Sequence, residues 1–407
     1  MLAMSAMSAM VVTTLVGCGA QASGGNEVDG KKVIRFATWD SAEDVEQQQK
    51  LVDDFNASQD EIIVKLEAYG SEYDTKISAG MGSGDAPDVM YMWNYPTYYQ
   101  ALEPLDSFIE GDAGYKDNFY ETLWDYNMID EVTYGIPVGF TTHALFYNKD
   151  IFEQAGVSLP TEDWTWNDLQ QAAKTISENV EGVKGFSFQM KPDPYDFEMY
   201  AWSNGGAYAD EEGNLDGNLN SKETQEVFTM FQNMYKDGYA IATEKNGTDE
   251  FRSGKTAMYI YGSWALHSFD EDGLNYGVVE IPSFENAGKD SVSILSSSGL
   301  AISKSSKNKD AAWKFIQYWT GEECNKARVG YELPVLKSVV EELDIMNNEK
   351  NAPFYTMLEQ SQGYTPTSFI IENWSELSEN LSLSFERMFN PSALEDVKVV
   401  LDEAVAN

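Results

Sequence analysis

Hydrophobic residues near the start of the chain follow two different periods, and the two periods alternate along the sequence. Short apolar runs at Val33–Ala37, Ile62–Leu66 and Val89–Trp93 predict β-strands, the second of them through alternation of apolar and polar side chains. Between these runs, residues 45–55 place apolar side chains on one helical face, and Glu72–Gly80 is also expected to be helical. This β-α-β-α-β order predicts an α/β fold with a mixed, mostly parallel sheet flanked by helices.

The stretch Tyr134–Gly156 predicts a turn, a buried strand and a short helix in immediate succession. Gly135 and Pro137 mark the turn, and the following run rich in Phe, Thr, Leu and Tyr favours a strand. Either Asn148 or Asp150 can cap the short helix, and the glycine at the end of the stretch stops it.

Two polar or glycine-rich segments invite a ligand-site hypothesis that the sequence does not support. Residues 210–220 carry oxygen ligands at nearly calcium-loop density, but the glutamate expected at the twelfth loop position is absent, so a β-hairpin is favoured. Gly80, Gly82 and Gly84 follow a helix instead of opening one, and no Gly-Lys-Ser/Thr follows them. They are expected to end the helix before the next strand, not to hold a phosphate.

Length and composition restrict the class of protein. A chain of 407 residues is too long for one ordinary core and suits two lobes of about 150–200 residues each. A hydrophobic content of 43% excludes a disordered chain. The net charge of −40 argues against binding to nucleic acid or to anionic lipid and fits a protein exposed to an extracellular medium.

Residues 1–17 are expected to be a signal peptide. They end in Leu15-Val16-Gly17 before Cys18, which resembles the lipobox of bacterial lipoproteins. Cleavage there would leave Cys18 lipidated, and residues 18–30 would form a flexible tether. We therefore expect lipid anchoring at the outer face of the cytoplasmic membrane, at the cell surface or in the periplasm. Cys324 has no partner, so we expect neither a disulfide nor a cysteine-based metal site, and the thiol is expected to be buried.

Four segments, taken in order, resemble the extracellular solute-binding proteins of ABC importers, in the branch that binds carbohydrates. The likeness extends over roughly residues 31–395. The segments are SGDAPDVMYMW at 83–93, GIPVGFTTHALFYNKDIFEQAG at 135–156, FRSGKTAM with the following GSW at 251–264, and GYELPV at 330–335.

The resemblance implies a two-lobed, periplasmic-binding-protein-like fold in which a ligand lies between the lobes. Each lobe would hold a mixed, mostly parallel sheet flanked by helices, and a hinge of several strands would join them. Lobe 1 would comprise residues 31–140 and 297–328, and lobe 2 residues 141–296 and 329–407. The chain would cross between the lobes near Gly139–Thr142, Ser296–Gly299 and Lys326–Tyr331.

Candidate ligand contacts follow from this two-lobed fold. Trp39, Trp93 and Trp264 each follow a predicted strand, and open α/β sheets place ligands at strand exits. Flat rings suit the apolar faces of sugars, while carboxylates and amides suit the hydroxyls. By contrast, the helical spacing of Trp313 and Trp319 assigns them to the core. The predicted ligand-binding residues are Trp39, Asp40, Trp93, Asn94, Thr141, Asp193, Tyr195, Trp202, Trp264, Glu332 and Trp374.

The sequence favours a binding protein over an enzyme. A glycosidase needs two carboxylates about 5–9 Å apart, and no local motif marks such a pair among the acidic residues. His143 and His267 lack metal-site spacing, and neither a metal nor a cofactor is expected. We expect a monomer that captures a sugar or oligosaccharide and delivers it to the membrane subunits of an ABC permease. Two alternatives remain open: the same fold binding a polyamine or another small polar solute, or a secreted glycoside hydrolase.

Overall fold

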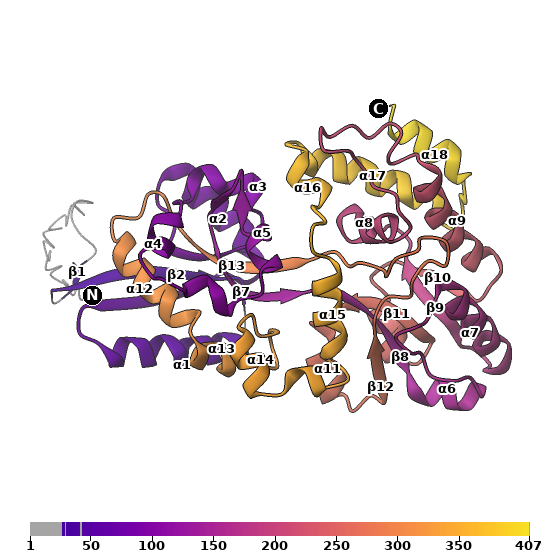
Figure 1. Cartoon of the computed structure of the whole chain (residues 1–407), viewed down its shortest axis with the longest axis horizontal. Helices are drawn as coiled ribbons and strands as arrows, with labels where there is room; N and C mark the ends of the chain where they lie inside the picture. Colours follow the sequence, from indigo (N-terminus) through magenta and orange to yellow (C-terminus); the bar gives the residue numbers. More distant parts are fainter. Residues whose placement is uncertain (1–26, 29, 41–42, 407) are drawn as a thin grey trace, which may run out of the picture.

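The computed structural model describes residues 27–28, 30–40 and 43–406, so the predicted signal peptide and Cys18 lie outside the described residues. The described chain forms two lobes side by side, each built around its own β-sheet (Figure 1). The predicted two-lobed α/β architecture with mixed sheets is confirmed. No helix among the described residues is both long and apolar enough to cross a bilayer.

The sheet of lobe 1 has the strand order β1-β2-β4-β13-β7, with β3 paired to the other side of β2. Strand β2 is parallel to β3 and β4, as the early β-α-β-α-β pattern predicts. Strand β13 is antiparallel to both of its neighbours, β4 and β7. The strands are β1 (Glu27–Val28), β2 (Lys31–Thr38), β3 (Ile62–Ala68), β4 (Val89–Met92), β7 (Ile136–Thr141) and β13 (Ser296–Ile302).

The sheet of lobe 2 has the order β10-β9-β11-β8-β12. Strand β9 is parallel to β10 and β11, whereas β8 is antiparallel to β11 and β12. The strands are β8 (His143–Asn148), β9 (Lys184–Gln189), β10 (Ala240–Thr243), β11 (Thr256–Gly262) and β12 (Tyr276–Val279), and a small hairpin of β5 (Met128–Ile129) and β6 (Val132–Thr133) belongs to neither large sheet.

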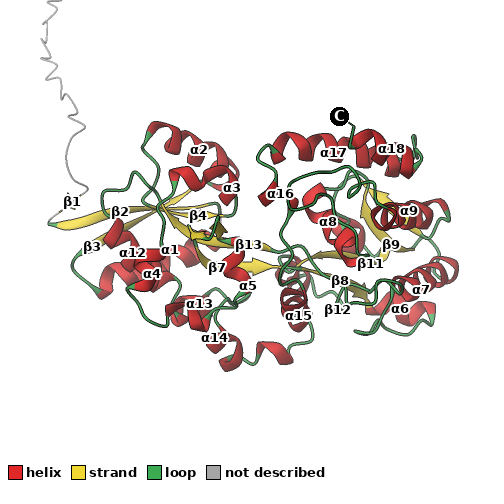
Figure 2. Cartoon of the chain, turned by 45° about the horizontal axis from the view of Figure 1, so that its top comes forward, coloured by secondary structure: helices red, strands yellow, loops and turns green. Residues whose placement is uncertain are grey.

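Helices surround both sheets (Figures 1 and 2). Those packed with lobe 1 are α1 (Glu43–Ser58), α2 (Tyr73–Ser83), α3 (Tyr95–Tyr98), α4 (Asp106–Glu110), α5 (Thr122–Tyr126), α12 (Lys309–Trp319), α13 (Glu322–Ala327) and α14 (Lys337–Glu342). The others are α6 (Lys149–Ala155), α7 (Trp166–Asn179), α8 (Pro194–Ser203), α9 (Lys222–Lys236), α10 (Thr248–Arg252), α11 (Ala265–Glu271), α15 (Ala352–Gln360), α16 (Thr367–Ile370), α17 (Trp374–Phe389) and α18 (Val397–Ala404).

Local signals in the sequence account for several helix ends. Asn148 accepts a hydrogen bond from Ile151 N and caps α6, which ends at Gly156 in the left-handed region, where φ is 69°. Gly84 ends α2 in the same way, as predicted. The predicted hairpin at 210–220 is wrong, because Asp210 accepts hydrogen bonds from the backbone of Glu212 and Asn214 and folds the segment into turns.

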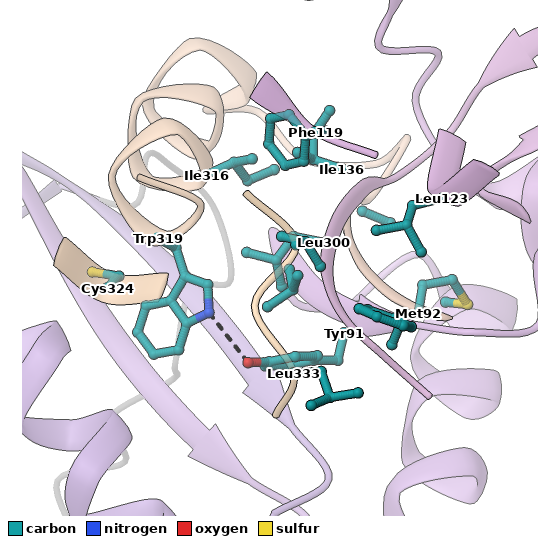
Figure 3. Close-up of a cluster of buried hydrophobic side chains, with 14 of the residues drawn as sticks. Tyr91, Met92, Phe119, Leu123, Ile136, Leu300, Ile316, Trp319, Cys324 and Leu333 are labelled. Atoms are coloured by element: carbon teal, nitrogen blue, oxygen red, sulfur yellow. Dashed lines mark hydrogen bonds between the residues drawn. The ribbon is translucent and has the colours of Figure 1, made fainter. Parts of the chain in front are cut away.

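The core of lobe 1 is centred on large aromatic side chains (Figure 3). Trp319 is fully buried and donates a hydrogen bond from Nε1 to Tyr91 Oη at 3.2 Å. Phe36 packs against Trp319 with ring centroids 4.8 Å apart. Trp313 and Cys324 are also buried, so the predicted core positions of both tryptophans and of the cysteine are confirmed. Tyr91 thus connects this core to the strand exit at Trp93.

Three passages of the chain join the lobes. Thr142 alone separates β7 of lobe 1 from β8 of lobe 2, and residues 291–295 lead from lobe 2 into β13. The first two predicted crossings are thus found where the sequence placed them. The predicted third crossing at Lys326–Tyr331 is wrong, because the chain beyond it still packs on lobe 1: Ser338 N donates to Asn118 Oδ1 at 2.9 Å.

The third passage therefore lies between α14 and α15, where α15 reaches β8 and Phe354 O accepts a hydrogen bond from the Thr142 hydroxyl. Residues 329–342 accordingly pack with lobe 1, whereas the predicted boundary at residue 328 assigned them to lobe 2. These residues stay with lobe 1 because α14 contacts α13 and the Asn118 segment. No local sequence pattern predicts these contacts.

Candidate ligand-binding cleft

A cavity of about 840 Å³ lies between the two lobes, and both lobes and the hinge strands line it. Most of the predicted contact residues border it, although they come from segments far apart in the chain. The predicted residues that line the cavity are Trp39, Trp93, Asn94, Thr141, Asp193, Tyr195, Trp264, Glu332 and Trp374.

One wall of the cavity, in lobe 1, is a cluster of aromatic rings. Trp39 follows β2 and Trp93 follows β4, and their ring centroids are 5.4 Å apart with the planes nearly perpendicular. Tyr73, at the start of α2, packs against Trp39 at 5.4 Å and against Trp93 at 5.9 Å. Tyr91 supports Trp39 from the core side at 4.8 Å. Both tryptophans keep part of their surface exposed, and they are held in place by neighbouring rings.

Trp264 lies on the opposite side, directly after β11. Its side chain is 47% exposed, and its ring leans on Tyr261 at 5.2 Å and on His143 at 5.8 Å. The hydroxyl of Thr141 accepts hydrogen bonds from Ser263 N at 2.7 Å and Ser263 Oγ at 2.9 Å. Thr141 therefore fixes the loop that carries Trp264. Burial lowers the pKa of His143 to about 4, so this imidazole is neutral at ordinary pH and packs behind the exposed ring.

Lobe 1 also contributes a carboxylate whose charge is already paired. Glu332 Oε2 accepts a hydrogen bond from Arg328 Nε at 2.9 Å, and the Arg328 side chain is only 4% exposed. The Arg328 guanidinium also donates to Trp319 O at 2.9 Å, which ties it to lobe 1. A Cβ on Gly139 would lie 2.9 Å from Glu332 Cδ, so any larger residue at this position of β7 would displace the Glu332 side chain.

Helix α8 brings two carboxylates to the lobe 2 side. Asp193 caps the helix by accepting a hydrogen bond from Tyr195 N at 3.0 Å, and Asp196 lies in the first turn. Burial raises the pKa of Asp193, and it raises the pKa of Asp196 to about 6. Tyr195 donates from its hydroxyl to Leu295 O at 2.6 Å and so connects α8 to the segment that enters β13.

A buried glutamate on α8 holds the start of α16. Glu198 is 1% exposed, and it accepts hydrogen bonds from Thr367 N at 3.0 Å and from the Thr367 hydroxyl. Burial raises the pKa of Glu198 to about 7, although the bonds from Thr367 act in the opposite direction. Thr367 begins α16, and the following Ser368 and Phe369 line the cavity. Glu198 therefore holds the edge of the cleft from within the core of lobe 2.

Two predicted residues do not border the cavity. Trp202 is 6% exposed in the core of lobe 2, where its ring packs against Tyr364 at 5.5 Å. Asp40 turns back onto the end of β2, where its carboxylate accepts hydrogen bonds from the Thr38 hydroxyl at 2.9 Å and from the Gln48 amide. Both side chains therefore stabilise the structure around the cleft instead of facing it.

The sequence analysis missed several residues that line the cavity. Tyr73 and Asp74 lie in the first turn of the helix predicted over Glu72–Gly80 but were not predicted to contact a ligand. Asp196 is three residues after Asp193, a spacing that places both on one helical face. That spacing could have identified Asp196. Tyr126 and Phe369 carried no local signal, because only the meeting of the two lobes brings them together.

The remaining observation is the similarity of the chain to a known protein family. Residues 39–326 match the family described as bacterial extracellular solute-binding protein, which covers more than half of the chain. The chain belongs to this family. The resemblance inferred from the sequence motifs is thereby confirmed, and the match to a family of binding proteins gives no support to the glycoside hydrolase alternative.

Individual relatives of this solute-binding protein differ in the ligand that their names state. It is 26% identical over 385 residues to the galactooligosaccharide-binding protein of Bacillus subtilis, which covers 90% of this chain and 87% of that protein. It is also 26% identical over 296 residues to the sn-glycerol-3-phosphate-binding periplasmic protein of Rhizobium meliloti, covering 69% and 68%. A solved structure of an ABC substrate-binding protein from Listeria monocytogenes in complex with cycloalternan has 25% identity and a TM-score of 0.78, with 93% of this chain and 98% of that chain covered.

Proposed function

We propose that this solute-binding protein captures a sugar or oligosaccharide between its lobes and delivers it to the permease of an ABC importer. The observation that carries the proposal is the cavity of about 840 Å³ with aromatic rings from both lobes. Its volume falls within the range of about 300–1,000 Å³ common for small-molecule sites. The names of the galactooligosaccharide-binding relative and of the cycloalternan complex support the same class of ligand.

The chemistry of the lining suits a saccharide. Trp39 and Trp93 on one side and Trp264 and Trp374 on the other offer flat apolar surface for the C–H faces of sugar rings. Hydroxyl and amide groups between them can exchange hydrogen bonds with equatorial hydroxyls. The polar lining residues that could do so are Ser71, Asn94, Ser263, Ser296, Ser297, Ser298, Ser368, Ser375 and Ser378.

Binding would be coupled to closure of the lobes. A ligand that touches both lobes gains contacts only when they approach each other, so it shifts the equilibrium towards the closed form. Thr142, residues 291–295 and the passage between α14 and α15 are the segments that would absorb the rotation. A separate membrane permease would recognise the closed, monomeric form.

Lipid anchoring through Cys18 completes the proposal. The lipobox-like Leu15-Val16-Gly17 before it supports this location. The tether predicted to end at residue 30 would end earlier, because residues 27–28 form β1 and pair with β2. Cys18→Ala should prevent lipidation, so the precursor should stay uncleaved or the protein should appear in the medium. Fractionation and mass determination of the N-terminus measure this outcome, and normal maturation of the variant would refute the anchor.

A thermal-shift screen against a glycan panel tests the central proposal. A ligand present at 100 times its dissociation constant adds about 2.7 kcal/mol of stability, which is readily measured. The polyamine alternative predicts hits with spermidine or putrescine and affinity that falls steeply with salt, whereas sugar binding should be nearly independent of salt. A binding protein should return each glycan unchanged, and turnover of an oligosaccharide would instead indicate a hydrolase.

A further inference from the structure

The charged residues that line the cavity all have the same sign. They are Asp74 on α2, Asp193 and Asp196 at the start of α8, and Glu332 of lobe 1, and none of the described residues that line the cavity is Lys, Arg or His. Only Glu332 forms a salt bridge, with Arg328. Within the described part of the chain, the three aspartates have no ion pair, so their negative charge is uncompensated in the cavity.

The first turn of α8 shows why an anionic ligand is disfavoured in this cavity. The N-terminus of a helix attracts anions, because its backbone N–H groups point outward and the helix dipole is positive there. At α8 this position is already filled: Asp193 accepts the bond from Tyr195 N, and Asp196 adds a second carboxylate in the same turn. A phosphate or carboxylate of a ligand would find the N–H groups of Tyr195 and Phe197 already bonded to Asp193 and two like charges beside it.

Helix α17, which also starts at the cavity, gives no better position for an anion. Trp374 N donates to Ile371 O at 3.2 Å, and Glu376 N donates to Asn373 O at 3.2 Å. Glu376 also places a carboxylate in the first turn of this helix. Repulsion is strengthened by burial, since charges in a partly dehydrated cleft are weakly screened. Burial already raises the pKa of Asp74, Asp193 and Asp196, and a further negative charge nearby would disfavour their ionised forms still more.

We propose that the cleft selects its ligand by charge: it accepts uncharged and amine-bearing saccharides and excludes saccharides that carry carboxylate or phosphate groups, with Asp196 as the main determinant. The inference rests on the proposed function, because the aromatic cavity is taken to be a saccharide site and the carboxylates decide which saccharides fit. It separates this chain from a relative such as the sn-glycerol-3-phosphate-binding protein, whose named ligand is an anion.

The experiment uses the whole mature protein and four groups of probes in one thermal-shift screen at pH 7.5. These are neutral oligosaccharides, glucosamine oligomers, galacturonate oligomers with sugar phosphates and glycerol 3-phosphate, and the non-sugar amines spermidine and putrescine. Hits confined to the first two groups support the proposal. Hits among the anionic saccharides overturn charge selection but leave saccharide binding intact. Hits with amines alone overturn saccharide binding but agree with selection against anions. The absence of any hit overturns both saccharide binding and charge selection.

Asp196→Asn then assigns the effect to one residue. Calorimetry measures the affinities for a neutral hit and for its uronate counterpart in both proteins. The ratio of uronate affinity to neutral affinity should be at least about tenfold higher in Asp196→Asn than in the unmodified protein, since one like charge has been removed. Asp163→Asn, an exposed aspartate of the same lobe outside the cavity, is the matched control and should leave the ratio unchanged. An unchanged ratio in a folded Asp196→Asn protein would remove Asp196 from the proposal.

Discussion

The ring of Tyr126 in lobe 1 lies 5.1 Å from the ring of Phe369 in lobe 2, and both rings line the cavity. Tyr126 ends α5, which packs against β7 and β13, whereas Phe369 lies on α16, which Glu198 holds from the core of lobe 2. The pair therefore adds a contact between the lobes next to the hydrogen bond from the Tyr195 hydroxyl to the Tyr126 hydroxyl at 3.5 Å. Opening of the cleft would separate the rings.

This contact leads to a prediction about binding. Phe369→Leu should weaken the affinity for a saccharide identified in the glycan screen by about 3–10-fold, because an aromatic pair contributes roughly 0.5–1.5 kcal/mol and is formed only when the lobes approach. Calorimetry measures the change. Phe284→Leu, at a half-buried phenylalanine of lobe 2 outside the cavity, serves as the control, and equal affinities for all three proteins would contradict the role of the contact.

Trp264 and Trp202 should respond to truncation in opposite ways. Trp264→Ala should cost roughly 1–3 kcal/mol of binding and little stability, since the residue is 47% exposed. Trp202→Ala should cost about 3–5 kcal/mol of folding stability, because it empties a buried site. Urea unfolding and calorimetry on both variants separate the two effects. Unfolding of the Trp264 variant would show that its ring belongs to the core.

Trp93→Ala tests the facing wall of the cavity in the same way. Its ring is exposed on the cleft side and supported by Trp39 and Tyr73, so a loss of roughly 1–3 kcal/mol of binding is expected. Measured affinity equal to that of the unmodified protein would mean that the ligand does not contact Trp93.

Glu198 predicts a dependence of stability on pH. Its pKa is raised from 4.5 to about 7, so between these values the folded protein binds more protons at this site than the unfolded chain does. The contribution of Glu198 to stability therefore falls as the pH rises from about 5 to 8. Glu198→Gln lacks this titration but can still form a hydrogen bond with Thr367. The unfolding free energy of the variant minus that of the unmodified protein should therefore increase by on the order of 3 kcal/mol as the pH rises over that range. Unfolding curves that stay parallel at pH 5, 6.5 and 8 would be inconsistent with a buried, titrating Glu198.

Closure itself should be visible in solution scattering. The two lobes have separate sheets and meet mainly at three passages of chain, so ligand should cause a rotation with little change inside either lobe. To move the open-to-closed ratio from about 1:99 to 99:1, the ligand must favour the closed form by about 5.5 kcal/mol. The radius of gyration should decrease at saturating saccharide. An identical radius with and without ligand would rule out this mechanism.

The sequence predicted the parts of the cleft that depend on local structure. Trp39, Trp93 and Trp264 follow strands, and strand exits in α/β sheets gather at one edge, so their meeting could be expected. Trp202 could not be assigned in this way, because α8 packs against α9 and α17 and its residues 197–203 are all buried, which no apolar periodicity in its sequence indicates. The late third crossing was missed because it depends on Asn118 and Ser338, which are 220 positions apart in the chain.

The position of β13 has a consequence for how the protein is made. This strand fills the space between β4 and β7, so the sheet of lobe 1 consists of two separate pieces until residue 302 has left the ribosome. Pairings between segments this distant carry a large loop-closure entropy and slow folding, and unpaired strand edges invite aggregation in the meantime. A nascent chain that ends before Ser296 should therefore depend on a chaperone, although it already contains every other strand of lobe 1.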